Sequence, residues 1–226
     1  MQLTYTCRAP ARITHRPPLL VLLHGVGGNE TGFERLLSQL DPRLLALCVR
    51  APFENTPGGY RWFDVSFSGR SVDIDVEEAE HSRLAVIQFI NDAVMGFGAD
   101  PRRVYLLGFS QGATLAYSIG LTAPARLRGI VGIGGRVLPE IAAQAAPMSA
   151  LRHLTLLIQH GARDPVMSLE RARATRDLFV DLGVMLGYRE YPAAHELSAE
   201  MADDACEFLS TQIDRFERAG APPFVA

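Results

Sequence analysis

The chain of 226 residues is 48% hydrophobic and 21% charged, a composition typical of a soluble globular protein with one domain over residues 1–226. Its net charge of −3 argues against nucleic acid or an anionic membrane surface as a partner. All 22 basic residues are arginine, which excludes a lysine Schiff base and a Walker-type phosphate loop.

Three cysteines lie far apart in the sequence, and none forms a C-x-x-C pair: Cys7, Cys48 and Cys206. This spacing favours neither a zinc site nor a thioredoxin-like site, so we expect unpaired thiols in a reducing cytoplasm. The first apolar run, residues 19–23, is short and follows two prolines, so we expect no signal peptide. Because no run reaches about 18 apolar residues, we expect no membrane span and no stable membrane anchoring.

Strand-like and helix-like segments alternate along the chain. Residues 2–9 are expected to form an antiparallel edge strand. Near-continuous apolar runs follow, and such runs are typical of strands that are buried on both faces of a parallel sheet. The expected strands after the first cover residues 19–23, 44–49, 103–109, 128–134, 154–159 and 184–191.

Helical patterns separate these strands. Thr31 and Glu34 fit a capping box that opens a short helix. Residues 77–95 are expected to form a helix with a buried stripe of Leu84, Ile87, Ile90 and Val94. Further helices are expected at 111–121, 168–182 and 198–217, the last with an inner face of Met201, Ala205, Phe208, Ile213 and Phe216. This βαβ alternation predicts a doubly wound α/β fold of three αβα layers with a mostly parallel central sheet.

Residues 51–71 form one long stretch without hydrophobic periodicity. The stretch contains two prolines, three glycines and five aromatic residues, including the single tryptophan. Loops of this length in a compact domain are usually functional or disordered, and five aromatic side chains argue against disorder. We therefore expect a functional loop here.

The segment VYLLGFSQGATLAYSIG, residues 104–120, joins an apolar run to a helical pattern through one serine. Gly108 and Gly112 flank Ser110 in a G-x-S-x-G pattern, which is the sharp strand-to-helix turn called a nucleophile elbow. The two glycines allow close backbone approach, and Ser110 is expected in strained geometry with an exposed hydroxyl group. The alternative is an ordinary serine in a glycine-rich turn.

A nucleophilic serine needs a base and an acid that orients the base, and in this fold they follow in the order Ser, Asp or Glu, His. Asp164 follows the strand expected at 154–159, although it also fits an aspartate of a turn or helix cap. Asp177 and Asp181 are alternatives by residue type only, because both lie in an amphipathic helix. His195 lies between the last expected strand and the last helix, where the base belongs.

The sequence LLVLLHGVGGNE, residues 19–30, ends its strand at His24 and turns through glycines, as an oxyanion loop of the H-G-G-G type does. The expected oxyanion donors are the backbone N–H groups of Val26 and of Gln111, the residue after the nucleophile. His24 is expected to brace this loop. A Rossmann interpretation is weak, because Glu30 occupies the position of the third glycine in G-x-G-x-x-G.

Together these motifs resemble the small carboxylesterase/phospholipase family of α/β hydrolases, which includes the acyl-protein thioesterases. The matching segments are LLHGVGGNE, RWFDV with DIDVEEAEHSRLAVIQFI after it, LLGFSQGA, IQHGARDPVM and YPAAHELSAE, and they extend over residues 19–209. Ala113 and Ala194 stand where many relatives carry glycine, and neither difference removes a reacting group.

The resemblance implies an α/β-hydrolase fold and a role for particular residues. It makes Ser110 the nucleophile, with Asp164 and His195 as its partners, and it agrees with the two oxyanion donors named above. It also implies that Trp62 and Phe63 lie near the acyl site.

These residues predict hydrolysis of a small-molecule carboxylic ester of short to medium acyl chain length through an acyl-enzyme, without a metal ion or other cofactor. The acyl pocket is expected to be lined by Phe53, Tyr60, Trp62 and Phe63, unless these side chains only pack the loop against the sheet. Cleavage of thioesters or lysophospholipids by the same triad is one alternative, and a non-catalytic binding protein on a hydrolase scaffold is another. We expect a monomer or a homodimer.

Overall fold

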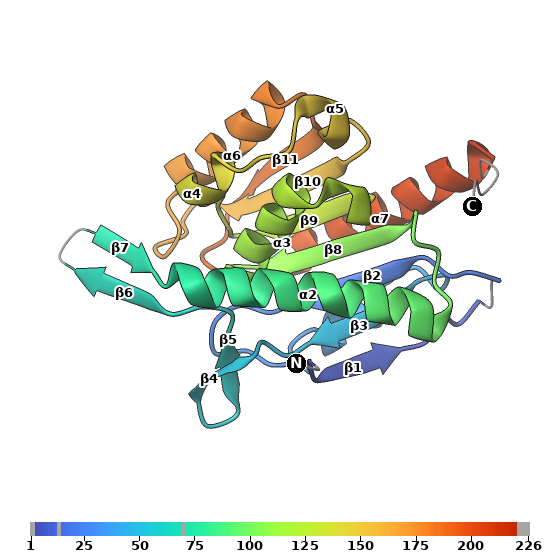
Figure 1. The fold of residues 1–226 in the computed structure, drawn as a ribbon, viewed down its shortest axis with the longest axis horizontal. Helices are drawn as coiled ribbons and strands as arrows, with labels where there is room; N and C mark the ends of the chain where they lie inside the picture. Colours follow the sequence, from blue (N-terminus) through green and yellow to red (C-terminus); the bar gives the residue numbers. More distant parts are fainter. Residues whose placement is uncertain (1–2, 13–14, 69–70, 221–226) are drawn as a thin grey trace.

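A computed structural model describes residues 3–12, 15–68 and 71–220. Over these residues a seven-stranded sheet runs through the molecule in the order β1–β3–β2–β8–β9–β10–β11 (Figure 1). β1 pairs with β3 in the antiparallel sense, and every other neighbouring pair in this sheet is parallel, as predicted. The strands of this sheet are β1 (Tyr5–Arg8), β2 (Leu19–Leu23), β3 (Leu45–Val49), β8 (Val104–Phe109), β9 (Gly129–Ile133), β10 (Thr155–Gly161) and β11 (Met185–Tyr191).

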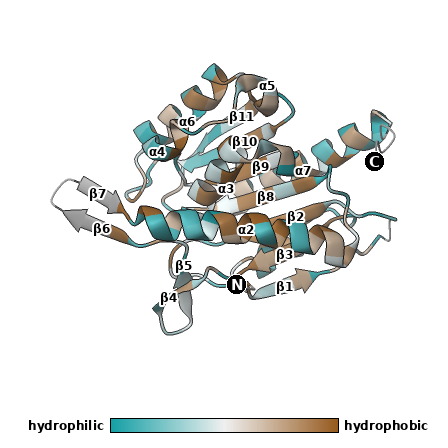
Figure 2. Ribbon diagram, in the orientation of Figure 1, coloured by the Kyte–Doolittle hydropathy of each residue, from teal (hydrophilic) through white to brown (hydrophobic). Residues whose placement is uncertain are grey.

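Helices cover both faces of the sheet, because successive side chains of a strand point to opposite faces and both sets are apolar here. In β2 the side chains of Leu19 and Val21 join one apolar cluster, and the side chain of Leu20 joins the other. In Figure 2 the hydrophobic colour predominates in β2 and β8 and alternates with the hydrophilic colour along α2. The described helices are α1 (Glu34–Leu37), α2 (Val76–Phe97), α3 (Gln111–Thr122), α4 (Pro139–Ala142), α5 (Met148–Leu151), α6 (Leu169–Asp181) and α7 (Ala199–Arg218).

The three predicted layers follow from this division of the helices. Residues of α2, α3 and α6 pack in the first apolar cluster, and residues of α1 and α7 pack in the second. Among the described residues, no helix is both long enough and apolar enough to cross a membrane. The three cysteines are unpaired, as predicted, and burial raises the pKa of Cys48 to about 12.

α1 differs from the predicted capping box. The helix starts at Glu34, and no side chain caps its first turn. Instead, Oδ1 of Asn29 accepts hydrogen bonds from the N–H and hydroxyl groups of Thr31 at 2.9 and 2.8 Å. The capping-box prediction is therefore wrong, because Asn29 holds Thr31 in a turn that precedes the helix.

α2 turns a different face to the core from the predicted stripe. Of the four stripe residues only Ile90 is fully buried, and Leu84 is 52% exposed. The buried face also contains a polar residue, Ser82, whose hydroxyl group donates to the carbonyl oxygen of Trp62. This face of α2 contacts Trp62, which belongs to residues 53–63, the aromatic segment. Hydrophobic periodicity in the sequence does not reveal this contact.

Most of residues 51–71 forms hairpins rather than one loop. β4 (Phe53–Thr56) pairs with β5 (Gly59–Arg61), and β6 (Val65–Ser68) pairs with β7 (Ser71–Ile74), both in the antiparallel sense. Both hairpins extend beyond the main sheet (Figure 1). These strands are too short to produce a recognisable alternation in the sequence, so the prediction of one irregular loop is corrected.

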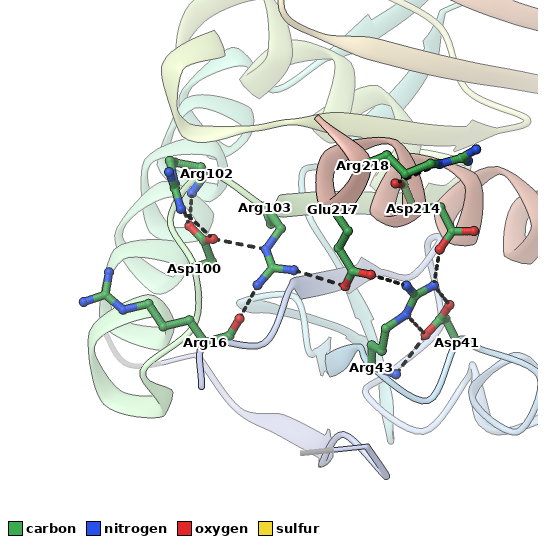
Figure 3. A network of polar contacts seen from close by, with 9 residues as sticks. All are labelled: Arg16, Asp41, Arg43, Asp100, Arg102, Arg103, Asp214, Glu217 and Arg218. Atoms are coloured by element: carbon green, nitrogen blue, oxygen red, sulfur yellow. Dashed lines mark hydrogen bonds and ion pairs between the residues drawn. The ribbon is translucent and has the colours of Figure 1, made fainter. Parts of the chain in front are cut away.

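Arginines and carboxylates form a connected network at the amino ends of β3 and β8 (Figure 3). Arg43, which precedes β3, contacts Asp214 at 2.7 Å and Glu217 at 2.9 Å. Asp41 also contacts Arg43, at 2.6 Å, and Arg103, which precedes β8, contacts Glu217 at 3.8 Å. Since Asp214 and Glu217 belong to α7, the network fixes this helix to the amino end of the sheet.

Candidate active site

The turn after β8 holds Ser110 in a strained backbone conformation. β8 ends at Phe109 and α3 begins at Gln111, so Ser110 is the single residue between strand and helix. With a φ of 55° and a ψ of −116°, it is the one residue other than glycine that has a positive φ in the described ranges. Such strain clusters at functional sites. The turn has the geometry of a nucleophile elbow.

Gly108 and Gly112 are required by close backbone contacts on both sides of Ser110. A Cβ atom on Gly112 would lie 2.0 Å from the carbonyl oxygen of Leu23 in β2. A Cβ atom on Gly108 would lie 2.3 Å from the carbonyl oxygen of Gly112. α3 can therefore pack this closely against the sheet only with glycine at both positions.

Three side chains from separate connections meet at the carboxyl ends of β8, β10 and β11. Nδ1 of His195 donates a hydrogen bond to Oδ2 of Asp164 at 2.6 Å. The hydroxyl group of Ser110 donates to Nε2 of His195 at 2.9 Å. The ring of Phe109 lies beside the imidazole, with 5.1 Å between centroids. The structure thus brings together the three residues predicted as nucleophile, acid and base.

The carboxylate of Asp164 is buried and hydrogen-bonded through both oxygens. Oδ1 accepts the backbone N–H groups of Val166 and Met167, both at 2.8 Å, while Oδ2 accepts from His195. Burial raises the pKa of Asp164, but these hydrogen bonds outweigh burial and hold the pKa below its usual value. Asp164 therefore stays ionised at neutral pH and can stabilise a positively charged imidazole.

His160 is a buried histidine behind the triad. Its Nε2 atom donates to the carbonyl oxygen of Met167 at 2.7 Å and lies 3.7 Å from Oδ2 of Asp164. Its Nδ1 atom has no hydrogen-bond partner in the part of the chain that the structure describes. His160 therefore orders the loop that carries Asp164.

Backbone N–H groups after β2 and at the start of α3 lie beside Ser110. A Cβ atom on Gly25 would lie 3.2 Å from Cβ of Ser110, so the two turns are in contact. Gln111 is the first residue of α3, and its N–H group has no acceptor within the helix. Among the backbone bonds of the described residues, none uses the N–H group of Val26. Both predicted donors are therefore available to a ligand oxygen.

The aromatic segment braces the loop after β2. The N–H group of Gly27 donates to the carbonyl of Tyr60 at 2.8 Å, and the N–H group of Tyr60 donates to the carbonyl of Gly28 at 2.9 Å. The indole N–H group of Trp62 donates to the carbonyl of His24 at 2.8 Å. The hairpin β4–β5 thus holds the predicted oxyanion loop in place through the backbone, a role that the sequence does not reveal.

His24 is held as a neutral imidazole. Nδ1 donates to the carbonyl of Gly25 at 2.7 Å, and Nε2 accepts the N–H group of Ala51 at 3.0 Å. Burial lowers the pKa of His24, in agreement with this neutral form. Since both ring nitrogens are occupied, His24 braces the loop as predicted.

The side chain of Gln111 links the elbow to the aromatic segment. Its Oε1 atom accepts the N–H group of Trp62 at 3.1 Å, and its Nε2 atom donates to the carbonyl of Phe63 at 2.9 Å. Gln111 is 8% exposed, so its amide cannot exchange these partners for water without cost. The residue therefore positions Phe63 at the site.

A cavity of about 240 Å³ adjoins Ser110. Val26 and Gln111 line it, and so does Phe63, one of the four aromatic residues predicted for the acyl pocket. Much of the remaining wall is apolar and includes Val65 and Ile74. Among the residues that the structure describes, no three His, Cys, Asp or Glu side chains are grouped as metal ligands are.

The other three predicted pocket residues do not line this cavity. Trp62 is fully buried, and its indole lies against the ring of His24 with 5.5 Å between centroids. Tyr60 packs against the first apolar cluster. The ring of Phe53 lies against the ring of His81, with 5.7 Å between centroids. The structure thus differs from the prediction for these three residues, whose side chains pack against other parts of the molecule and not at the cavity.

Sequence reasoning misses two arginines of the cavity wall, Arg136 and Arg171. Arg136 follows β9, and Arg171 lies in the first turn of α6. A position just after a parallel strand is a signal for ligand contact and applies to Arg136. Arg171 resembles any charged residue of an amphipathic helix, so no local signal identifies it.

The strand order and the elbow after β8 place this fold among the α/β hydrolases. The sequence model of the phospholipase/carboxylesterase family matches residues 10–213, and the chain belongs to that family. The protein is therefore a hydrolase, and the resemblance seen in the sequence is confirmed.

Known relatives and solved structures agree with this assignment. Acyl-protein thioesterase 1 of Gibberella zeae is 31% identical over 159 residues, which are 67% of this chain and 68% of that protein. Esterase YpfH of Escherichia coli is 28% identical over 171 residues, which are 73% of this chain and 69% of that protein. The crystal structure of the Bacillus cereus carboxylesterase has a TM-score of 0.81 at 22% identity, covers 93% of this chain and 94% of its own, and supports the fold.

Proposed function

We propose that the protein hydrolyses carboxylic esters through an acyl-enzyme formed on Ser110. His195 accepts the proton of the Ser110 hydroxyl group as its oxygen attacks the ester carbonyl, and Asp164 stabilises the resulting imidazolium. His195 then protonates the leaving alcohol and later accepts a proton from the water that releases the acid. The observation that carries the proposal is the continuous hydrogen-bond chain from Ser110 through His195 to Asp164.

The N–H groups of Val26 and Gln111 are the proposed donors to the carbonyl oxygen as it gains negative charge. Gln111 begins α3, where the helix dipole also favours a negative charge. The loss of one such donor typically costs about 3 kcal/mol of transition-state stabilisation. The bracing of the loop at Val26 by the β4–β5 hairpin therefore contributes to the rate.

The cavity supports short to medium acyl chains. Its volume of about 240 Å³ and its apolar wall, with Phe63, Val65 and Ile74, suit a small hydrophobic acyl group. Thioester cleavage by the same residues is supported equally, because relatives such as the Gibberella zeae protein are named acyl-protein thioesterases. A comparison of kcat/KM for a butanoate ester and the matching thioester distinguishes the two.

Replacement of the nucleophile tests the proposal. Ser110→Ala is expected to lower kcat for 4-nitrophenyl butanoate by about 10⁴-fold or more while the protein still unfolds cooperatively. Ser118→Ala is the matched control, because Ser118 lies in α3, the helix that follows Ser110, and its hydroxyl group bonds only to the carbonyl of Thr114 among the described residues. Hydrolysis that survives in Ser110→Ala would refute the mechanism.

Covalent labelling separates an enzyme from a binding protein on the same scaffold. A fluorophosphonate is expected to modify Ser110 stoichiometrically in the wild type and not at all in Ser110→Ala. The cytoplasmic location and the monomeric or homodimeric state stay predictions from the sequence.

A further inference from the structure

Two arginine guanidinium groups of the cavity wall form no hydrogen bond or ion pair with the described residues. Arg136 and Arg171 both line the cavity that adjoins Ser110, and both are partly buried. Within the described residues, their hydrogen bonds are made by their backbone N–H groups, to Thr114 and Ser168, and neither guanidinium group forms a hydrogen bond or ion pair.

The positive charge of these two residues is not balanced at the cavity. The third arginine of the wall, Arg61, contacts Glu78 at 2.9 Å and Asp64 at 3.5 Å. Asp64 is the one carboxylate of the described cavity wall, and it is thus already beside Arg61. Arg136 and Arg171 therefore leave the cavity with an excess of positive charge.

The environment disfavours the charged form of Arg136. Burial, and next the charge of Arg171, lower the pKa of Arg136, and the opposing effect of Glu140 is smaller. Two cations that repel each other in a partly buried wall cost stability unless an anion lies near them. A bound anion would remove this cost, which is the physical basis of many anion sites.

We propose that Arg136 and Arg171 bind a carboxylate of the substrate, so that the ester cleaved at Ser110 is itself an anion. This inference rests on the proposed function and adds the substrate class. A guanidinium group presents parallel N–H donors that match the two oxygens of a carboxylate. The apolar wall around Val65 and Ile74 then holds the carbon chain between the carboxylate and the ester.

Pairs of esters that differ only in this charge test the proposal. On the acyl side, mono-4-nitrophenyl adipate is compared with its terminal amide, 4-nitrophenyl adipamate. On the alcohol side, 4-carboxyphenyl butanoate is compared with 4-carbamoylphenyl butanoate. In each pair the measured quantity is the charge preference, defined as kcat/KM for the carboxylate divided by kcat/KM for the amide. The pair with the larger preference shows which part of the substrate carries the anion.

Three variants connect the preference to the arginines. The wild type is expected to prefer the carboxylate in one pair by about tenfold or more, because charge-assisted hydrogen bonds are strong in a partly buried site. Arg136→Gln and Arg171→Gln are each expected to reduce this preference by about tenfold. Arg173→Gln is the matched control. Arg173 is exposed, lies in α6 as Arg171 does, and contacts Glu190 at 2.8 Å. It should leave the preference unchanged.

The outcomes separate this inference from the proposed function. If the wild type hydrolyses the neutral esters and Ser110→Ala does not, but neither pair shows a preference, the anion site is refuted and the esterase stands. A preference that persists in both arginine variants also refutes the site. If Ser110→Ala hydrolyses the esters as the wild type does, or the wild type cleaves none of them, the proposed function fails and this inference fails with it. Thermal unfolding of each variant shows that the compared proteins are folded.

Discussion

The two ends of the central sheet surround their arginines differently. At the amino end, Arg43 contacts two carboxylates of α7 as well as Asp41 beside it (Figure 3). At the carboxyl end, Arg136 and Arg171 line the cavity at Ser110 and, over the described residues, contact no carboxylate. Arginines at the first end are paired within the protein, while two at the second are left for another molecule.

Backbone strain is also found at the carboxyl end of the sheet. The turn at the carboxyl end contains the strained residue Ser110, and Gly108 and Gly112, two residues before and after it, cannot accept a larger side chain. Protein structures tolerate strain and unbalanced charge mainly where a ligand or a reaction uses them. We therefore infer that the amino end of the sheet contributes stability and that the carboxyl end contributes the reaction, and the following changes test this division.

The largest expected effect is that of Gly112→Ala at the carboxyl end. The added Cβ atom would lie 2.0 Å from the carbonyl oxygen of Leu23, so the free energy of unfolding should fall by about 3 kcal/mol or more. Urea denaturation measures this. The control is Gly96→Ala in α2, where a Cβ atom has nothing within 4 Å and the helix should gain up to about 1 kcal/mol. Equal effects at the two glycines would contradict the role of close packing.

Arg43→Gln tests the amino end. It removes the contacts to Asp41, Asp214 and Glu217 and leaves the buried Asp41 without its cation, so the free energy of unfolding should fall by about 2 kcal/mol. kcat/KM should be unchanged, because the network lies at the opposite end of the sheet from Ser110. A clear loss of activity in a folded Arg43→Gln variant would contradict the assignment of separate roles to the two ends of the sheet.

Acid should reduce the difference in unfolding free energy between the wild type and Arg43→Gln. The hydrogen bond from Arg43 lowers the pKa of Asp41 below its usual value. A lowered pKa stabilises the fold above the ordinary aspartate pKa of about 3.9, and this stabilisation is lost as the pH falls through the pKa of the folded state. The gap in unfolding free energy between wild type and Arg43→Gln should therefore be constant near neutral pH and narrow below about pH 4. A gap that widens in acid would contradict this assignment.

Ser110→Gly should relieve the strain of the elbow. Glycine accepts a φ of 55° without the clash that a Cβ atom causes, so Ser110→Gly should be more stable than Ser110→Ala by about 1 kcal/mol. Both variants lack the nucleophile, so thermal unfolding compares them without a difference in chemistry. Equal melting temperatures would show that the conformation costs little.

The smallest expected effect is that of Arg136→Gln on stability. The pKa of Arg136 is lowered, so the folded state holds this charge less well than the unfolded state, and its removal should not lower the free energy of unfolding. Urea denaturation of Arg136→Gln and Arg43→Gln side by side gives the sharpest form of the comparison. A loss in Arg136→Gln as large as that in Arg43→Gln would show a structural partner for Arg136.

Much of the fold could be predicted because its signals are local. The apolar run 19–23 and the run 104–107 are buried strands, and the glycines around Ser110 are required by contacts that any such turn makes. The triad follows from the order of Asp164 and His195 along the chain, since parallel strands bring their carboxyl ends together. Ser110 and His195, 85 positions apart, are therefore expected at one site from the motif around Ser110 and the order of the strands.

The other features of the fold and the site depend on contacts between distant segments, and no local sequence pattern indicates these contacts. The β4–β5 hairpin is fixed by the bonds of Tyr60 to the loop after β2, and the buried face of α2 contacts Trp62 through Ser82. The excess charge of Arg136 and Arg171 can be recognised only in the structure, where the segment after β9 and the start of α6 line the same cavity. In the sequence each of these arginines is one of 22.

In the proposed mechanism, the carboxylate of Asp164 influences both proton transfer and the choice of substrate. Oδ2 of Asp164 orients His195, while Oδ1 fixes the backbone of Val166 and Met167, whose side chains form part of the cavity wall. A change at this position alters the shape that an acyl chain meets as well as the basicity of the imidazole. A substitution of Asp164 therefore changes the reaction rate and the substrate selectivity at the same time, and neither property can evolve through this residue alone.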